Sequence, residues 1–408
     1  MSEDSHHETL SPPSEYTVKP YTPVSHPDTA NTGTLFPTEI VAPAVGMSEP
    51  FVRKILGRKP LLTEDDVRVL LDQDAFAETF VPRSKVLGFL RQEVAQIDKK
   101  PEIAFEFPEH LNSLAQGDAV ELIQSLPNQS IDCVVTSTPY WAMRVYDTII
   151  ERTWADGETC SFGLEQTPEG FIRHTVEILH RLSPKVKEKG SIFWNLLDTY
   201  NTRTQIRSNA AEALHAMQGR DHRSWSDHQY RRYSSGHSYL FDGEQALIPH
   251  RIAERASRIG YYNKSTISWC KTATTPEPQL SRVSRNVEYV LHLSKHRTPK
   301  FFKESYLKLP SILGGKQPLE SEKLSDFWYL PTSSGRDGHG AQFPLQLPGR
   351  CIAISTEESD IVLDPFIGSG TTALAAAKLK RQYIGFDVSP EYLSAAHRKV
   401  DSIKDSLF

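Results

Sequence analysis

Two short segments of the chain combine residue types that could do chemistry. Residues 136–141 read Thr-Ser-Thr-Pro-Tyr-Trp, and residues 364–372 read Asp-Pro-Phe-Ile-Gly-Ser-Gly-Thr-Thr. The first resembles a clamp for a planar base, and the glycines of the second let backbone approach a ligand closely. Each segment follows an apolar run typical of a strand, residues 131–135 and 361–363. Because open α/β sheets bind ligands at the carboxyl ends of their strands, we expect the two segments to form one active site.

The second segment has the form of a nucleoside-binding turn. Residues 371–380 are rich in Ala and Leu, which predicts a helix directly after the glycines. A further apolar run ends at Asp387, about twenty residues after the turn, where nucleotide-binding folds place an acid for ribose hydroxyls. The segment lacks the third glycine of a dinucleotide fingerprint and the Gly-Lys-Ser/Thr of a P-loop. A nucleoside without a pyrophosphate fits better than a purely structural turn with a surface aspartate, because several features agree.

Taken together, the segments resemble the DNA amino-methyltransferases that use S-adenosylmethionine, the N4-cytosine/N6-adenine family. The order is the permuted, beta-type one, in which the catalytic segment precedes the cofactor segment. Further motifs follow in family order from roughly residue 115 to 400. They are residues 117–119, 126–127, 130–132, 163–165, 190–191, 198–200, 248–249, 251–253, 269–271, 276–277, Arg285, Glu288, 326–328 and 339–344.

The resemblance implies a role for each residue of the clamp. Ser137 Oγ and the Thr138 carbonyl would accept hydrogen bonds from the exocyclic amine, which stabilises the charge that develops on nitrogen during transfer. Pro139 completes the loop, and Tyr140 would stack on a base flipped out of the duplex. Trp141 is expected to serve the site rather than the core. No metal or covalent nucleophile is needed, since methyl transfer from a sulfonium requires mainly orientation.

The resemblance also implies a cofactor-binding set. Asp387 would bind the ribose, Asp118 would lie near the adenine, and Thr371 would hold the methionine carboxylate through helix-start amides. Phe366 and the glycines would line the methionine and adenosine moieties. The full set is Asp118, Asp364, Phe366, Gly368, Gly370, Thr371 and Asp387.

The first clamp residue bears on the target base. Family members with Ser followed by Trp mostly make N4-methylcytosine, and those with Asp or Asn mostly make N6-methyladenine, so Ser137 and Trp141 favour cytosine. Thr138 replaces the first of two family prolines and loses the fixed φ that rigidifies the loop. We therefore expect a site-specific cytosine-N4 methyltransferase of a bacterial restriction-modification system. An N6-adenine enzyme and a catalytically impaired, cofactor-binding DNA-binding protein are the alternatives.

Contact with DNA must be local, because the formal net charge is -5 and excludes a wholly basic surface. Residues 201–239 interleave arginines with His, Tyr and Trp, a composition suited to phosphate contact and base reading. The alternative for them is a solvated insertion loop. A second basic patch spans residues 295–308 and includes Phe301 and Phe302. Recognition inserts are thus expected near 201–243 and 295–325. The expected DNA-binding residues are Arg203, Arg207, Arg220, Arg223, Arg231, Arg232, Lys271, Lys300 and Lys303.

Other classes of protein are disfavoured by what the sequence lacks. The four cysteines form no Cys-x-x-Cys pair, so neither a zinc site nor a disulfide scaffold is indicated. There is no His-Glu-x-x-His, and the glycine turn lacks the spacing of a nucleophile elbow. No apolar run reaches membrane-spanning length and no secretory leader begins the chain. The expected location is the bacterial cytoplasm, with nucleoid association through DNA.

We predict three parts for the chain. Residues 1–47, rich in Ser, Thr and Pro, read as a disordered arm. Residues 48–100 read as a helical appendage, with helix starts at Thr63 and Ser84, which could pack on the next domain, contact DNA or mediate dimers. Residues 101–408 alternate strands and helices and predict a doubly wound, Rossmann-like α/β methyltransferase domain. Its partners would be double-stranded DNA with one base flipped out and a cognate restriction endonuclease acting on the same site.

Overall fold

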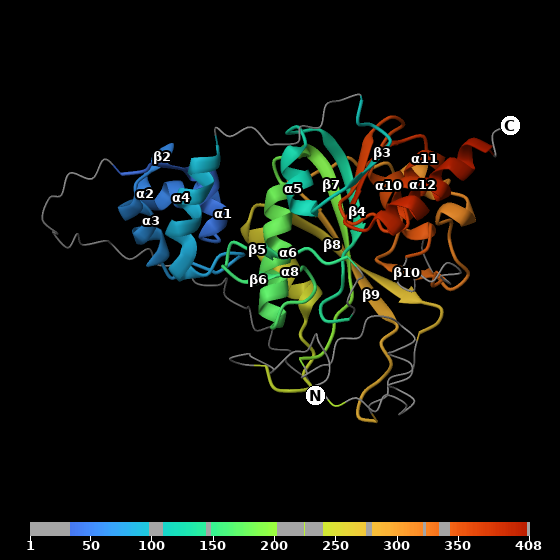
Figure 1. Cartoon of the computed structure of the whole chain (residues 1–408), viewed down its shortest axis with the longest axis horizontal. Coiled ribbons are helices and arrows are strands. Elements are labelled where there is room, and N and C mark those ends of the chain that lie inside the picture. Colours follow the sequence, from blue (N-terminus) through green and yellow to red (C-terminus); the bar gives the residue numbers. More distant parts are fainter. Residues whose placement is uncertain are drawn as a thin grey trace, which may run out of the picture.

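The computed structural model describes residues 33–97, 109–143, 148–201, 224, 240–274, 280–320, 324–333 and 343–405. Its centre is an eight-stranded sheet in which β9 runs antiparallel to both of its neighbours and all other pairs are parallel (Figure 1). In sheet order the strands are β10 (Phe327–Leu330), β8 (Tyr262–Lys271), β9 (Val287–Ser294), β7 (Val186–Leu196), β4 (Ile131–Ser137), β11 (Ile361–Asp364), β12 (Gln382–Asp387) and β3 (Ser113–Gln116).

Both chemical segments lie at the same edge of this sheet. Strands β4 and β11 are parallel neighbours, with Leu363 paired to Val134. The two apolar runs are buried along most of their length, as expected for central parallel strands covered on both faces. Ser137 and Asp364 therefore end adjacent strands, and the prediction that both segments follow strands is confirmed.

Helices cover both faces of the sheet (Figure 1). One face is covered by α5 (Ala119–Ser125), α6 (Pro168–Leu182) and α8 (Ile248–Arg258), and the other by α10 (Gln346–Ser355), α11 (Thr371–Lys378) and α12 (Pro390–Asp405). Alternate residues of β4 divide between the two cores: Val134 packs with the first set of helices, whereas Cys133 and Val135 pack with α10 and α11. This arrangement confirms the predicted α/β fold with a doubly wound sheet.

A small helical unit precedes the sheet domain. It contains β1 (Phe36–Pro37), α1 (Thr38–Ala44), α2 (Glu49–Leu56), β2 (Leu61–Leu62), α3 (Glu64–Leu71), η1 (Arg83–Lys85) and α4 (Val86–Gln96). Thr63 begins α3 with a capping box, as predicted. Ser84 lies inside η1 and caps no helix, so that prediction is wrong. Residues 36–44 do not belong to a disordered arm, because they form β1 and α1, and Phe36 and Val41 are fully buried in the core of the unit. Residues 1–32 lie outside the described residues.

The helical unit packs on α6 of the sheet domain. The Phe80 ring stacks on His180 at 4.7 Å between centroids, and Arg181 pairs with Glu93 at 2.6 Å. Burial, with the nearby Arg181 charge, lowers the pKa of His180 to about 3, so the ring packs as a neutral group. Of the three roles left open by the sequence, packing on the neighbouring domain is the one supported by these contacts.

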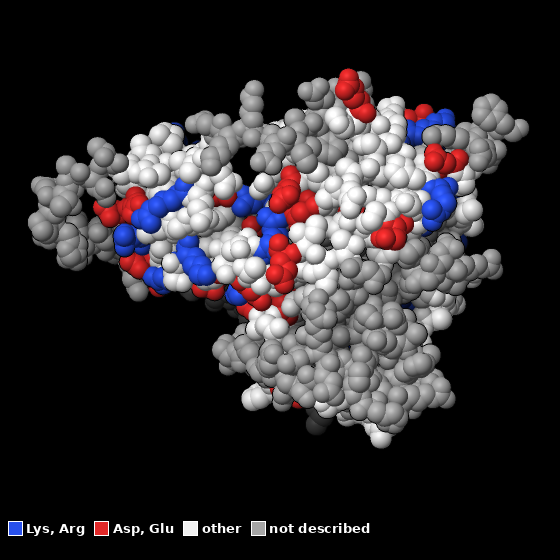
Figure 2. Space-filling view, in the orientation of Figure 1, with Lys and Arg blue, Asp and Glu red and all other residues white. Residues whose placement is uncertain are grey.

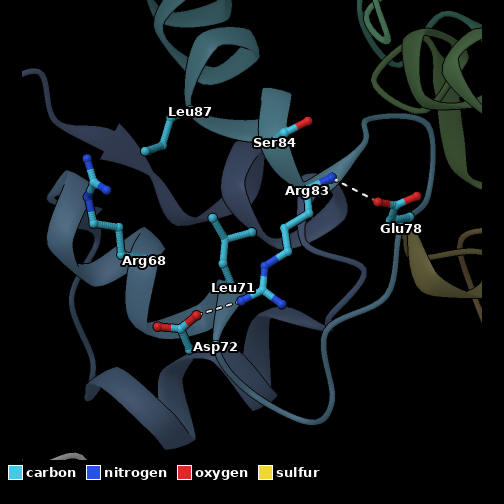
Figure 3. A pocket seen from close by; sticks show the side chains of 7 residues that line it. All are labelled: Arg68, Leu71, Asp72, Glu78, Arg83, Ser84 and Leu87. Atoms are coloured by element: carbon cyan, nitrogen blue, oxygen red, sulfur yellow. Dashed lines mark hydrogen bonds and ion pairs between the residues drawn. The ribbon is translucent and has the colours of Figure 1, made fainter.

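A surface hollow of about 650 Å³ on the helical unit is lined by charged and apolar side chains (Figure 3). Arg83 pairs with Asp72 at 2.5 Å across it, and the backbone amide of Arg83 donates to Glu78 at 3.1 Å. The hollow belongs to α3, η1 and α4, away from the strand ends that carry the chemical segments (Figure 1). Within the described part of the chain, no helix is long and apolar enough to cross a membrane.

Candidate active site

The clamp loop turns sharply after β4 and rests on a second loop. Ala142 adopts a left-handed φ of 57°, and its amide donates to the Gly163 carbonyl at 2.8 Å. Gly163 itself has a φ of 93°, and a Cβ there would lie only 3.1 Å from the Pro139 side chain. The glycine therefore allows the two loops to approach closely and fixes the position of the clamp.

The two aromatic residues of the clamp have different surroundings. Trp141 is 1% exposed, and its indole donates to the Glu165 carbonyl at 2.9 Å. It is a core residue, so the expectation that it serves the site directly is wrong; a ring that apolar neighbours enclose cannot stack on a base. Tyr140 is only partly buried and points its hydroxyl to Ser137, 3.2 Å from Oγ.

The structure adds three polar side chains to the clamp. Asn195 of β7 pairs with Ser137 in the sheet register, and its amide nitrogen lies 2.8 Å from Tyr140 Oη and 3.3 Å from Ser137 Oγ. Glu288 of β9 accepts hydrogen bonds from Tyr140 and Asn195. Lys271, at the end of β8, donates to the other Glu288 oxygen at 2.9 Å. Neighbouring strands thus bring one polar network to Ser137.

The sequence predicted no role for Asn195, and it indicated Glu288 only as one residue of a family motif. Asn195 follows the apolar residues 192–194, and Glu288 stands beside Val287 in a mostly buried strand; a buried polar residue needs a partner. That interruption is the signal that could have singled them out. Lys271 was expected to bind DNA, but its ammonium is paired with Glu288 beside the clamp.

In the second segment, Asp364 shapes the turn from inside. It is 1% exposed, and its carboxylate accepts from the hydroxyls of Thr136 and Thr372 at 2.6 Å each. The Phe366 amide donates to the same carboxylate at 3.0 Å. Burial raises the pKa of Asp364 to about 6. Asp364 therefore joins β11, β4 and α11, and it would act on a ligand through the shape of the loop rather than by contact.

The glycines of the turn meet two different requirements. Gly370, with a φ of 84°, lies against α12, because a Cβ there would approach the Ala396 Cβ to 2.7 Å. Gly368, with a φ of 50°, borders open space, since a Cβ there would meet only the Phe366 carbonyl oxygen at 4.0 Å. Lys399 of α12 donates to Ser369 at 2.7 Å and to Thr371 at 3.2 Å, which fixes the start of α11.

The two acids expected at the cofactor lie close together. Asp387 ends β12, and its backbone carbonyl accepts from the Gly117 amide at 3.0 Å. Its carboxylate accepts from Gly368 and Ser389 amides at 2.9 Å, while burial raises its pKa. Asp118 caps α5 and pairs with Arg152, and all of these contacts fall on its Oδ1.

Residues 131–398, which include the clamp, the polar network and the cofactor turn, match the N6/N4 methyltransferase family, described as DNA methylase. The chain belongs to this family. It is 30% identical over 291 residues to the Type II methyltransferase M.XycI of Xanthomonas campestris pv. cyanopsidis, covering 70% of this chain and 86% of that protein. To the Type II methyltransferase M.SmaI of Serratia marcescens it is 27% identical over 296 residues, covering 70% and 89%. A solved structure titled PvuII DNA methyltransferase (cytosine-N4-specific) aligns at 21% identity and a TM-score of 0.49, over 76% of this chain and 94% of that one.

S-adenosylmethionine is the cofactor of this methylase, and the turn fits it. The open side of Gly368 leaves room for a ligand beside the backbone. Asp387, partly exposed at the strand end, has acceptor capacity for ribose hydroxyls. The Phe366 ring, held against Phe162 at 5.6 Å and Trp194 at 6.3 Å between centroids, offers an apolar wall.

The expected DNA-binding residues of the methylase fall into two groups. Arg203, Arg207, Arg220, Arg223, Arg231 and Arg232 lie outside the described residues. The ends of their segment are described and lie at the clamp edge: Tyr200 and Gln245 form a β-bridge, and the Asn201 amide donates to the Glu244 carbonyl at 2.7 Å. The described residues on either side of this segment are therefore paired with each other just beyond the end of β7.

The second group lies at the opposite edge of the sheet. Lys300 pairs with Asp132, near the start of β4, at 3.0 Å and with Asp360, just before β11, at 2.8 Å. Lys303 begins α9 (Lys303–Leu307), which packs on α10. Because β9 runs antiparallel to β7, the chain leaves β9 at the amino ends of the parallel strands. Lys300 and the patch at 295–308 therefore lie at the edge opposite the clamp, and their contact with DNA stays a prediction.

A buried ionic network lies between α6 and the clamp of the methylase. His174 on α6 contacts Glu165 through Nδ1 at 3.0 Å and Asp156 through Nε2 at 3.2 Å, and its ring stacks on Trp154 at 4.2 Å. Glu165 also accepts from the Gly163 amide at 3.0 Å and, through its carbonyl, from Trp141. The network thereby joins α6 to the clamp loop and to the second loop, which contains Gly163.

His174 also belongs, with Glu158 and Cys160, to a group whose ligand atoms lie within 4.8 Å of one another in the described residues. Both imidazole nitrogens are already hydrogen-bonded to carboxylates. Burial raises the pKa of the Cys160 thiol well above its usual range, which opposes the thiolate form that metals bind. The group is accounted for as part of the ionic network.

The network predicts a pH-dependent stability. Burial alone would lower the pKa of His174, but hydrogen bonds to Asp156 and Glu165 raise it from 6.5 to about 9. A raised folded-state pKa stabilises the fold fully below pH 6.5, and this contribution is lost as pH rises through 9. We expect the melting temperature to fall between pH 6.5 and 9.5, measured by circular dichroism. The variant His174→Gln should melt lower and lose this part of the pH dependence; an equal slope in both proteins would contradict the assignment.

Proposed function

We propose that this methylase transfers a methyl group from S-adenosylmethionine to the exocyclic N4 amine of cytosine at a short specific site in double-stranded DNA. The observation that carries the proposal is the position of Ser137, which ends β4 next to the cofactor turn after β11 and is held there by Tyr140 and Asn195. Serine at this position favours cytosine over adenine by the family pattern. Trp141 fits the same pattern but is buried, so the choice of base depends on Ser137.

The chemistry requires mainly orientation. The cofactor supplies an electrophilic methyl group on a sulfonium. Ser137 Oγ and the Thr138 carbonyl accept hydrogen bonds from the two amine protons, which directs the nitrogen lone pair and stabilises the developing positive charge. Asp387 holds the ribose and thereby fixes the distance between donor and acceptor. Thr138 keeps the carbonyl of the family proline that it replaces, so the substitution leaves this chemistry possible.

A base stacked in a duplex cannot bring its amine to Ser137 at the end of a buried strand. We propose that the target cytosine is flipped out of the helix and stacks on Tyr140, which offsets part of the few kcal/mol that unstacking costs. Because similar proteins carry the name Type II methyltransferase, we further propose a restriction-modification setting, with a cognate endonuclease acting on the same site.

The test is the product. DNA incubated with the protein and S-adenosylmethionine is digested to nucleosides, and the modified base is identified by mass spectrometry. The expected product is N4-methylcytosine. N6-methyladenine would show an adenine enzyme on the same scaffold, and cofactor binding without any methylated nucleoside would show a DNA-binding protein that has lost catalysis.

We propose that DNA lies across the clamp edge and contacts the arginine-rich segment. The described residues that flank this segment support the proposal, since residues 200–201 pair with residues 244–245 just beyond the carboxyl end of β7. On the face shown in Figure 2, acidic and basic side chains are mixed over the helical unit and form no continuous basic surface. The expected DNA contact is therefore local, in accord with the net charge of -5.

Replacing Arg231 and Arg232 together by alanine should lower DNA affinity and flatten its salt dependence by up to about two units of slope, because two phosphate contacts are lost. Fluorescence anisotropy across a salt series measures both. The double variant Lys54→Ala/Arg58→Ala removes the same charge from exposed positions of the helical unit and should bind as the parent protein does. Unchanged affinity and slope in the Arg231/Arg232 variant would identify the segment as a solvated loop.

A further inference from the structure

Glu288 is the common acceptor of the polar network beside the clamp. The residue is 5% exposed. Its Oε2 accepts from the Tyr140 hydroxyl and from Asn195 Nδ2, the latter at 2.8 Å. Its Oε1 accepts from Lys271 Nζ at 2.9 Å, and the lysine balances its charge. Two carboxylate oxygens thus serve three donors, and an ionised carboxylate can only accept.

The number of protons on each group determines which atom donates in each hydrogen bond between Ser137, Tyr140 and Glu288. Tyr140 has a single hydroxyl proton, which it donates to Glu288. Its oxygen must therefore accept in the 3.2 Å contact with Ser137, so the Ser137 hydroxyl proton points to Tyr140. Both lone pairs of Ser137 Oγ are then acceptors: Asn195 Nδ2 approaches one at 3.3 Å, and the other remains for a further donor.

Asn195 reinforces this direction. Its two Nδ2 protons face Glu288 at 2.8 Å and Tyr140 Oη at 2.8 Å, with Ser137 Oγ farther away at 3.3 Å. The opposite amide orientation would set Oδ1 against the carboxylate, with two acceptors facing each other. In the orientation that satisfies Glu288, the buried Oδ1 has no hydrogen-bond partner in the described part of the protein. The structure thus keeps an unfavourable buried acceptor in order to direct the amide protons to Glu288 and Tyr140.

We propose that Glu288 is a positioning residue that sets the direction of the chain Ser137 to Tyr140 to Glu288, so that Ser137 presents a lone pair and not its proton to the target amine. The inference rests on the proposed role of Ser137 as an acceptor for that amine. A serine proton directed at the amine would meet N–H donors and would weaken the stabilisation of the developing charge.

Glutamine at position 288 has almost the same shape but a single oxygen for the three donors. If that oxygen serves Lys271, the amide nitrogen faces Tyr140 and Asn195. Tyr140 then accepts from the glutamine amide and donates to Ser137, which reverses the direction of the hydrogen bonds. If the oxygen serves Tyr140 and Asn195, the amide nitrogen faces the Lys271 ammonium at a distance set for an ion pair. Either orientation places two donors against each other.

The experiment compares turnover of the parent protein, Glu288→Gln, Tyr140→Phe and the double variant under saturating S-adenosylmethionine, with the methylated nucleoside identified in each. Glu288→Gln should lower kcat about tenfold or more and leave KM for DNA within about twofold, because the residue acts on the reacting amine through Ser137 and not on DNA affinity. Calorimetry should show unchanged S-adenosylmethionine binding. The exposed Glu254→Gln removes the same charge from α8 and should have parental turnover.

The double variant tests the path of the effect. Tyr140→Phe removes the hydroxyl that links Ser137 to Glu288. Adding Glu288→Gln to it should therefore lower turnover little further, within about twofold. Multiplying penalties would overturn the proposal, because Glu288 would then act independently of Tyr140, and so would full turnover in Glu288→Gln. If Glu288→Gln does not fold, Tyr140→Phe alone tests the proposal, because it removes the acceptor of the Ser137 proton. Parental turnover in Tyr140→Phe would then contradict the proposal. The parent protein tests the proposed function separately: a product other than N4-methylcytosine corrects the base and leaves these ratios valid.

Discussion

Alanine at position 137 is expected to reduce methyl transfer by about 10²-fold or more, the scale seen when one preorganised charge-stabilising partner is lost. The variant removes the side chain that we propose as the acceptor for the target amine, and it leaves the cofactor turn at residues 364–372 unchanged. Turnover is measured with tritiated S-adenosylmethionine, and cofactor affinity by calorimetry should barely change. Because Ser137 Oγ contacts Tyr140 and Asn195 only at 3.2 and 3.3 Å, the fold should tolerate its loss.

A matched control separates this effect from the loss of any hydroxyl. Ser84 is exposed on η1 of the helical unit, and Ser84→Ala should have parental turnover. Full turnover in Ser137→Ala would reject the role assigned to Ser137 and, with it, the direction of the hydrogen-bond chain that we attribute to Glu288.

Alanine at position 387 is expected to weaken S-adenosylmethionine binding by about 1 to 3 kcal/mol, the usual effect of losing a charged hydrogen bond. Part of the loss would come from the turn itself, since Asp387 also accepts from the Gly368 amide at 2.9 Å. Calorimetry on the folded variant measures the change. Asp65→Ala, at a position with a 95% exposed side chain on α3, removes the same charge and should bind the cofactor normally.

An unchanged dissociation constant in Asp387→Ala would move the ribose contact to another acid. Asp118 is the next candidate by position, because the Gly117 amide donates to the Asp387 carbonyl. Its Oδ1, however, already accepts from the first amides of α5 and from Arg152. We favour Asp387, because it lies beside Gly368, whose open side leaves room for a ligand, and its partners are backbone amides of the surrounding turns.

Local pattern was enough to predict the elements that carry the site. The runs before Ser137, Asp364 and Asp387 form strands β4, β11 and β12, because short, largely apolar stretches bounded by turn residues suit buried parallel strands. The capping box at Thr63 was likewise readable, since all of its partners lie within four residues. Composition misled at residues 36–44: a few apolar side chains in a Ser/Thr/Pro-rich stretch were enough to pack on the helical unit.

Contacts between distant residues decided the rest. Trp141 follows the clamp directly in sequence, yet its ring is enclosed by the core and bonded to Glu165 on another loop. Lys300 stands in a basic stretch, yet it neutralises Asp132 and Asp360 at the far edge of the sheet. No local pattern shows which edge a segment reaches, because that depends on the antiparallel course of β9.

By itself, the sequence determined the family, the α/β class, the cofactor turn and the position of Ser137, because each depends on short-range order: a strand, a turn and the residues that follow it. Only the tertiary structure decided what surrounds Ser137. Asn195 and Glu288 lie 58 and 151 positions after Ser137 along the chain, and they reach it through the pairing of β4 with β7 and of β7 with β9. Strand register, which is set by side chains along the whole sheet, brings these polar groups into contact. Residues so far apart along the chain form no local sequence pattern, so their contact could not be predicted from the sequence.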